Sequence, residues 1–209
     1  MPKLNENEKK LFDLVEKDCK KYDIDFVRSR HKSVNTGDSG RVSGFFDEQT
    51  LSVALKSYNW VHILAHEYSH LRQWVEEDET YTAKNHDGSC PIMTFTNWVN
   101  GVENNAELAL ESTKKVIALE RNCEMRAYKL LKRYDLIQSK EEKIEYKQLS
   151  NAYLYSHWVS YEHKLWPKSG WTKKLDYDVI PKSFRCEPHI RDNKKIHKHI
   201  LQSLRGEIE

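Results

Sequence analysis

Apolar residues recur at helical spacing between Trp60 and Trp74, in the stretch WVHILAHEYSHLRQW. Besides the two tryptophans, the apolar positions are Val61, Ile63, Leu64, Ala65 and Leu71. This pattern predicts a largely buried helix, with Asn59 in position to cap its first turn. The helix also carries two histidines and a glutamate among its apolar residues, and buried polar side chains are costly unless they have partners.

Three further segments have apolar residues every three or four positions, and they predict helices over residues 6–22, 103–134 and 139–166. Asn5 and Glu8 have the spacing of a capping box at the start of the first helix. Ser139 and Glu142 have the same spacing at the start of the last. Pro167 is expected to stop that last helix.

Short alternating segments predict a small sheet. Residues 24–26 read as a first strand, and residues 41–46 and 51–55 as a hairpin. Near the C-terminus, residues 175–179 alternate like an edge strand, and residues 196–204 have the spacing of a short helix. Residues 31–40 (HKSVNTGDSG) are expected to form a turn-rich loop. Residues 76–100 lack clear periodicity and are expected to be a long surface segment.

His66, Glu67 and His70 form the pattern H-E-x-x-H on the central predicted helix. Residues i and i+4 share one face of a helix, so the two histidines can offer imidazole nitrogens to a single ion. Glu67 lies about 100° around the helix from His66, where it reaches a water on that ion without being a ligand. Zinc catalysis uses such a set: neutral histidine ligands, an open coordination position and a carboxylate base.

A third ligand is expected from the predicted helix over residues 103–134. Glu120 falls inside the apolar stripe of this helix, and Glu124 lies toward the edge of the stripe. A carboxylate from a following helix commonly completes the coordination of an H-E-x-x-H zinc. The residues alone leave either glutamate as the ligand.

The chain resembles the gluzincin metallopeptidases, in which H-E-x-x-H is followed on a later helix by E-x-x-(small)-(acidic). The stretch from Glu120 to Glu124, ERNCE, has this pattern. The resemblance implies that Glu120 binds zinc and that Glu124 supports a zinc-bound histidine. Cys123 would be the small residue that lets the two helices approach.

The resemblance covers about residues 40–135, and within this family the chain looks like the compact cytosolic peptidases of bacteria and their phages. With Glu124 as the ligand instead, Ala127 would be the small residue but Tyr128 would replace the acid. A metzincin reading fails, because its glycine and third histidine would fall at Gln73 and Glu76.

The resemblance also directs attention to the predicted helix over residues 139–166. In gluzincins a tyrosine or histidine from the C-terminal half stabilises the oxyanion. Tyr153, His157 and Tyr161 share one face of this helix at i, i+4 and i+8, so they are the candidates for this role. The alternative is an aromatic core whose polar tips reach the surface.

Composition limits the partners. The chain has 209 residues, of which 32% are charged and 38% hydrophobic, and its net charge is +2. This length fits one domain, or one domain with an appendage. The small net charge argues against nucleic acid or a membrane as an obligatory partner. Basic residues outnumber acidic ones between Lys164 and Arg205, so this segment could contact nucleic acid, although a solvated face is the alternative.

The cysteines and the N-terminus indicate a cytoplasmic protein. The four cysteines are widely spaced without a C-x-x-C pair, which excludes a zinc ribbon and indicates reduced thiols. The first ten residues, MPKLNENEKK, contain no apolar signal core, and no apolar run approaches the length of a membrane span.

Together these features predict an α+β, zincin-like fold. A small antiparallel sheet is expected to pack on the H-E-x-x-H helix, and the C-terminal half is expected to be mainly helical. Residues 1–166 would form the metallopeptidase domain, and residues 167–209 a basic extension packed on it or appended to it. By analogy with zincins, the strand over residues 51–55 would be the edge on which an extended substrate pairs.

The predicted function is hydrolysis of a peptide or protein substrate by a zinc-activated water, with Zn²⁺ as cofactor and Glu67 as general base. Two other classes stay open on the residues alone. One is a regulatory or binding protein with a structural metal site. The other is a zinc hydrolase that acts on an amide other than a peptide bond.

Overall fold

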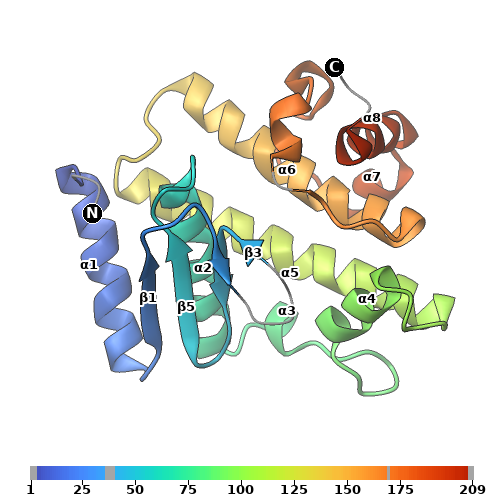
Figure 1. The fold of residues 1–209 in the computed structure, drawn as a ribbon, viewed down its shortest axis with the longest axis horizontal. Coiled ribbons are helices and arrows are strands. Elements are labelled where there is room, and N and C mark those ends of the chain that lie inside the picture. The colour runs from blue at the N-terminus through green and yellow to red at the C-terminus, as the bar shows by residue number, and fades with distance from the viewer. Residues whose placement is uncertain (1–3, 36–40, 169, 207–209) are drawn as a thin grey trace. The chain divides into compact units, whose positions relative to one another are not determined.

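The computed structural model of the protein describes residues 4–35, 41–168 and 170–206, and Figure 1 shows the course of the chain. Helices and a small sheet give an α+β fold, as the sequence predicts. The chain divides into two compact units, each made of two segments. The first unit comprises residues 1–81 and 123–138, and the second residues 82–122 and 139–209.

The first unit contains the strands β1 (Asp25–Ser29), β2 (Val34–Asn35), β3 (Arg41–Val42), β4 (Gly44–Phe46) and β5 (Thr50–Ala54). The main sheet has the order β1-β5-β4, and β2 pairs with β3 in a separate two-stranded ladder. β4 and β5 form the expected hairpin, with Phe46 opposite Leu51. β1 joins the other side of β5 in a parallel direction, with Phe26 opposite Leu51.

The main sheet is therefore mixed, and the expectation of an antiparallel sheet is wrong. The reason is the connection after β1, which returns through the region of β2 and β3 before the hairpin begins, so that β1 and β5 run in the same direction. The strand that was expected to be an edge, β5, is the central strand. The edges of the main sheet are β1 and β4.

The first unit contains the helices α1 (Glu6–Lys21) and α2 (Trp60–Val75), and α3 (Glu79–Thr82) begins in it and ends one residue beyond its first segment. The capping box predicted at Asn5 and Glu8 is present at the start of α1. α1 packs against β1, and α2 packs against β4 and β5 (Figure 1). Asn59 occupies the N-cap of α2, but its side chain makes no capping hydrogen bond. α2 is buried through Leu64, Ala65, Tyr68 and Leu71.

The long helix α5 (Ala106–Arg133) closely matches the expected one, and the division between the units runs through it between Asn122 and Cys123. Its apolar stripe is buried, as predicted. The buried members of that stripe are Val116, Ile117, Leu119, Cys123, Ala127 and Leu131.

The second unit is mainly helical, with α4 (Pro91–Val99), α6 (Lys140–His163), α7 (Glu187–Asp192), α8 (Lys194–Arg205) and the short 3₁₀ helices η2 (Trp171–Lys174) and η3 (Tyr177–Val179). The capping box predicted at Ser139 and Glu142 starts α6. That helix ends three residues before the expected Trp166, because Lys164 adopts a left-handed conformation at its C-cap.

Two sequence predictions fail in or beside this unit. The segment 76–100 was expected to lack regular structure, but it contains α3 and α4, which are too short to give a strong periodic signal. The edge strand expected at residues 175–179 is the 3₁₀ helix η3. There the buried side chain of Gln148 donates to the main-chain oxygens of Tyr177 and Ile180, which in a strand would pair with another strand.

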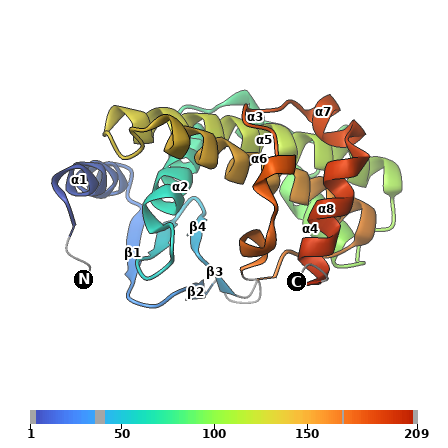
Figure 2. The ribbon, with the colours of Figure 1, turned by 90° about the horizontal axis from the view of Figure 1, so that it is seen from above.

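The C-terminal segment shares one core with α6. Apolar residues of α6 and of the segment form a single buried cluster that includes Leu154, Val159, Ile190 and Ile200. Asn151 reinforces this packing, because its side chain bonds the chain at Pro181, Ser183 and Arg185. α7 and α8 lie beside α6 in this core (Figure 2).

No helix in the described part of the chain is both long enough and apolar enough to cross a membrane.

Candidate metal centre

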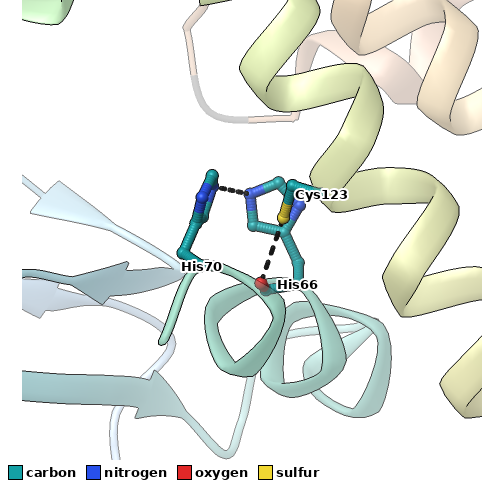
Figure 3. A group of neighbouring side chains, drawn as sticks. All are labelled: His66, His70 and Cys123. Atoms are coloured by element: carbon teal, nitrogen blue, oxygen red, sulfur yellow. Dashed lines mark hydrogen bonds between the residues drawn. The ribbon is translucent and has the colours of Figure 1, made fainter. Parts of the chain in front are cut away.

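His66 and His70 lie one turn apart on α2, and their rings turn toward each other (Figure 3). The two Nε2 atoms are 3.2 Å apart, and the rings meet edge to face with centroids 4.7 Å apart. Both residues are partly buried. The structure thus brings together the pair of imidazole nitrogens that the H-E-x-x-H spacing predicts.

Glu124 holds the first of these histidines. Its Oε1 lies 3.0 Å from His66 Nδ1, and the residue is only 8% exposed. A carboxylate accepts, so Nδ1 carries the proton, and a neutral His66 ring then has its lone pair on Nε2. This is the contact that the resemblance requires of an acid that supports a metal-bound histidine.

Gln73 holds the second histidine, which the sequence reasoning missed. Its Oε1 lies 2.8 Å from His70 Nδ1, and the side chain is fully buried. An amide oxygen accepts from Nδ1–H, which leaves the lone pair of a neutral His70 on Nε2. The available signal was the i, i+3 spacing of His70 and Gln73, combined with a long polar side chain in an otherwise buried helix.

The donor set fits a zinc ion. With both Nδ1 protons committed, two neutral rings would face each other with lone pairs on Nε2, and either a proton on His66 or a shared metal cation resolves that conflict. Two nitrogens bound to tetrahedral zinc at about 2.0–2.1 Å stand roughly 3.3 Å apart. The observed separation of 3.2 Å is close to this value.

The electrostatics of the pair also favour a cation. Burial lowers the pKa of His66, but the proximity of Cys123 and the hydrogen bond to Glu124 raise it more strongly. The pKa of this imidazole therefore stands well above its ordinary value. The surroundings that favour a proton on His66 favour a metal cation for the same reason.

Cys123 is a further donor near the pair that the sequence reasoning did not count as a ligand. Candidate ligand atoms of His66, His70 and Cys123 all lie within 4.8 Å of one another. The Cys123 thiol, however, donates to the main-chain oxygen of His66 over 3.2 Å (Figure 3). A metal would require the thiolate instead. The close contact between α2 and α5 fits the small residue expected at this position.

Glu120 precedes Glu124 by one turn of α5 and is 9% exposed. The division between the units assigns it to the second unit, whereas the histidines and Glu124 belong to the first. Its role as third ligand stays a prediction.

Glu67 lies beside the histidines on α2 and is 9% exposed. Its side chain faces β4 at Gly44. A methyl group added at Gly44 would stand 2.7 Å from Glu67 Oε1, 2.8 Å from Glu67 Cγ and 2.3 Å from Ile63 Cγ2. Glycine at this position is therefore what allows the strand to lie directly against the glutamate.

Tyr153, His157 and Tyr161 share one face of α6 in the second unit, as predicted. Their rings take part in aromatic packing: His157 contacts Tyr153 and Phe95, and Tyr161 stacks on Trp98. His157 Nδ1 donates to the main-chain oxygen of Tyr153 over 3.0 Å. These contacts agree with the aromatic-core alternative, and the oxyanion role stays a prediction.

Comparison with known proteins adds no relative to this description. No family model, curated protein or solved structure matches the chain. The chemistry of the site is therefore argued from its own atoms.

The contact between β4 and α2 generates a testable prediction. Gly44→Ala should lower the free energy of unfolding by about 1–3 kcal/mol, because the new methyl group overpacks against Ile63 and Glu67. Urea denaturation measures the loss. The cost should shrink in a background that carries Ile63→Ala and Glu67→Ala, because those changes remove the clashing atoms. An equal cost in both backgrounds would contradict the contact, and Ser43→Ala serves as the control.

Proposed function

We propose that this chain is a zinc-dependent metallopeptidase with a zincin-like arrangement of sheet and metal-binding helix. One observation carries the proposal. The Nε2 atoms of His66 and His70 face each other at 3.2 Å, while a different side chain occupies the Nδ1 of each ring. Two imidazoles whose Nδ1 atoms each have a side-chain partner and whose Nε2 atoms face each other are arranged as two ligands of one ion would be.

His66 and His70 would hold the ion, with Glu120 as the third ligand that the sequence predicts. Bound zinc would supply a Lewis acid that lowers the pKa of a water toward about 7 and polarises a carbonyl. Glu124 and Gln73 orient the two imidazoles. Such support from neighbouring groups typically strengthens the metal affinity of a site.

Glu67 would act as the general base. It follows His66 directly on α2, so it lies near the ion but off the axis of the ligand pair. Its carboxylate accepts a proton from the attacking water and later donates it to the leaving amine. Contact with β4 at Gly44 restricts where this carboxylate lies.

An extended peptide would pair with β4 rather than with β5. β5 already has a partner on each side, whereas in the main sheet of the described residues β4 pairs only with β5. β4 also carries Gly44, which lies against Glu67. Strand addition at this edge would bring a peptide backbone to the general base.

The proposed location is the cytoplasm. Cys19, Cys90, Cys123 and Cys186 are all free thiols, and thiols persist in reducing compartments.

Hydrolysis should depend on Glu67. Glu67→Gln keeps the shape of the side chain but cannot accept a proton, so peptide cleavage should fall by about 10²–10⁴-fold while bound zinc is retained. Mass spectrometry of new N-termini, in a protein mixture incubated with wild type or variant, measures cleavage. Glu79→Gln makes the same change at an exposed glutamate and should cleave like wild type.

Cleavage by Glu67→Gln at the wild-type rate would contradict the peptidase mechanism. Loss of zinc from this variant would contradict the geometry assigned to Glu67. A wild-type chain that holds zinc but generates no new termini would favour a structural metal site or another amide substrate.

Three variants separate the candidate ligands on α5. Glu120→Gln should lose zinc, Glu124→Gln should bind it about 10–100-fold more weakly, and Cys123→Ser should bind it nearly as wild type. Competition with a chromophoric chelator measures these affinities. If Cys123→Ser loses zinc and Glu120→Gln keeps it, the thiolate is the third ligand.

A further inference from the structure

A chain of polar side chains leads away from His70 on the side opposite the metal-binding nitrogen. Gln73 Oε1 lies 2.8 Å from His70 Nδ1, and Gln73 Nε2 donates to Thr80 Oγ1 over a longer 3.4 Å. The Thr80 hydroxyl donates in turn to Asp78 Oδ1 over 2.6 Å. The chain thus continues from α2 to the short segment that contains α3.

Asp78 is anchored from α5. Arg126 donates from one nitrogen to Asp78 Oδ2 over 2.7 Å and from another to Glu76 Oε2 over 2.6 Å. The main-chain N–H of Thr80 also donates to Asp78 Oδ1. Burial raises the pKa of Asp78, but the hydrogen bonds from Thr80 and Arg126 lower it by more than burial raises it. The pKa of Asp78 therefore stands below its ordinary value. Asp78 is therefore an ionised group that only accepts hydrogen bonds.

The direction of every bond in this chain follows from that acceptor. Because Asp78 can only accept, the single hydroxyl proton of Thr80 points to it. The oxygen of Thr80 is then available to accept from the amide NH₂ of Gln73, which turns the amide oxygen toward His70. An amide oxygen needs a donor, so His70 carries its proton on Nδ1 and has its lone pair on Nε2.

We propose that Thr80, Asp78 and Arg126 are positioning residues that fix the amide orientation of Gln73 and so hold His70 in the tautomer that binds the metal. This inference rests on the proposed function, because the tautomer with its lone pair on Nε2 is useful only if His70 binds zinc through that nitrogen. None of these three residues needs to touch the ion.

The two histidines would then receive different kinds of support from the same turn of α5. Glu124 contacts His66 directly, and its carboxylate can only accept from Nδ1. Arg126, two residues further on, acts on His70 through Asp78, Thr80 and Gln73. A neutral amide can present either its oxygen or its NH₂ group to His70. The hydrogen bonds through Thr80 and Asp78 therefore fix the orientation of Gln73, whereas a carboxylate would accept in either orientation.

The decisive experiment compares Thr80→Val with the double variant Thr80→Val, Gln73→Glu, in which residue 73 accepts from His70 without help from Thr80. Thr80→Val keeps the shape of the side chain but removes the acceptor for the Gln73 amide. It should lower zinc affinity by about 10–100-fold. Adding Gln73→Glu to Thr80→Val should restore the affinity, because a carboxylate accepts from His70 Nδ1 whatever lies behind it. Thr96→Val, on α4, is the matched control and should bind zinc like wild type.

A second readout needs no metal. Nitrogen-15 NMR of the metal-free full chain reports which ring nitrogen of each histidine carries the proton. His70 should carry it on Nδ1 in wild type and in the double variant, and should shift toward a mixture of tautomers in Thr80→Val. The signals of His66 should change little, because Glu124 still holds that ring.

The outcomes separate the inference from the function. An unchanged His70 tautomer in Thr80→Val, or a loss of affinity that Gln73→Glu does not restore, would overturn the inference and leave the proposed function standing. If wild type bound no zinc, the proposed function would fail. The NMR measurement would still decide whether Thr80 and the residues behind it set the tautomer of His70.

Discussion

The facing lone pairs of two imidazoles are the constraint on which this site depends. Glu124 and Gln73 occupy the Nδ1 atoms of His66 and His70, and the Nε2 atoms then meet at 3.2 Å. Neutral rings in this geometry repel unless a cation lies between them. The packing of α2 maintains the geometry, because buried residues such as Leu64 and Leu71 fix the helix against its surroundings. A proton on His66 or a metal ion between the two Nε2 atoms would satisfy both rings.

The elements around α2 each make contacts that position its side chains. The sheet supplies Gly44, which lets β4 lie against Glu67. α5 supplies Glu124 and, through Arg126 and Asp78, the anchor for the segment behind Gln73. α1 fixes the outer side of α2, because Asp18 accepts from both Tyr68 and Arg72. Segments distant in sequence thus contact residues 63–73 of α2, and the precision of the site depends on their packing.

The positions of the long helices could be predicted from local sequence. α1, α2, α5 and α6 have long apolar repeats, and two of them have capping boxes, so their positions follow from spacing alone. The resemblance to gluzincins led us to expect an acid at Glu124 beside a histidine of α2, and Glu124 contacts His66. The parallel pairing of β1 could not be predicted, because it depends on a long connection rather than on alternation. Gln73 and Gly44 were also missed, because their importance lies in which atoms of other segments they meet.

The most direct test of the account is a crystal structure of the full chain with anomalous scattering recorded at the zinc absorption edge. We expect one strong peak, about 2.0–2.1 Å from the Nε2 atoms of both His66 and His70. Nδ1 of His66 should remain bonded to Glu124, and Nδ1 of His70 to Gln73. Crystals grown with zinc that show no peak at this pair, or a peak bound through either Nδ1 atom, would contradict it.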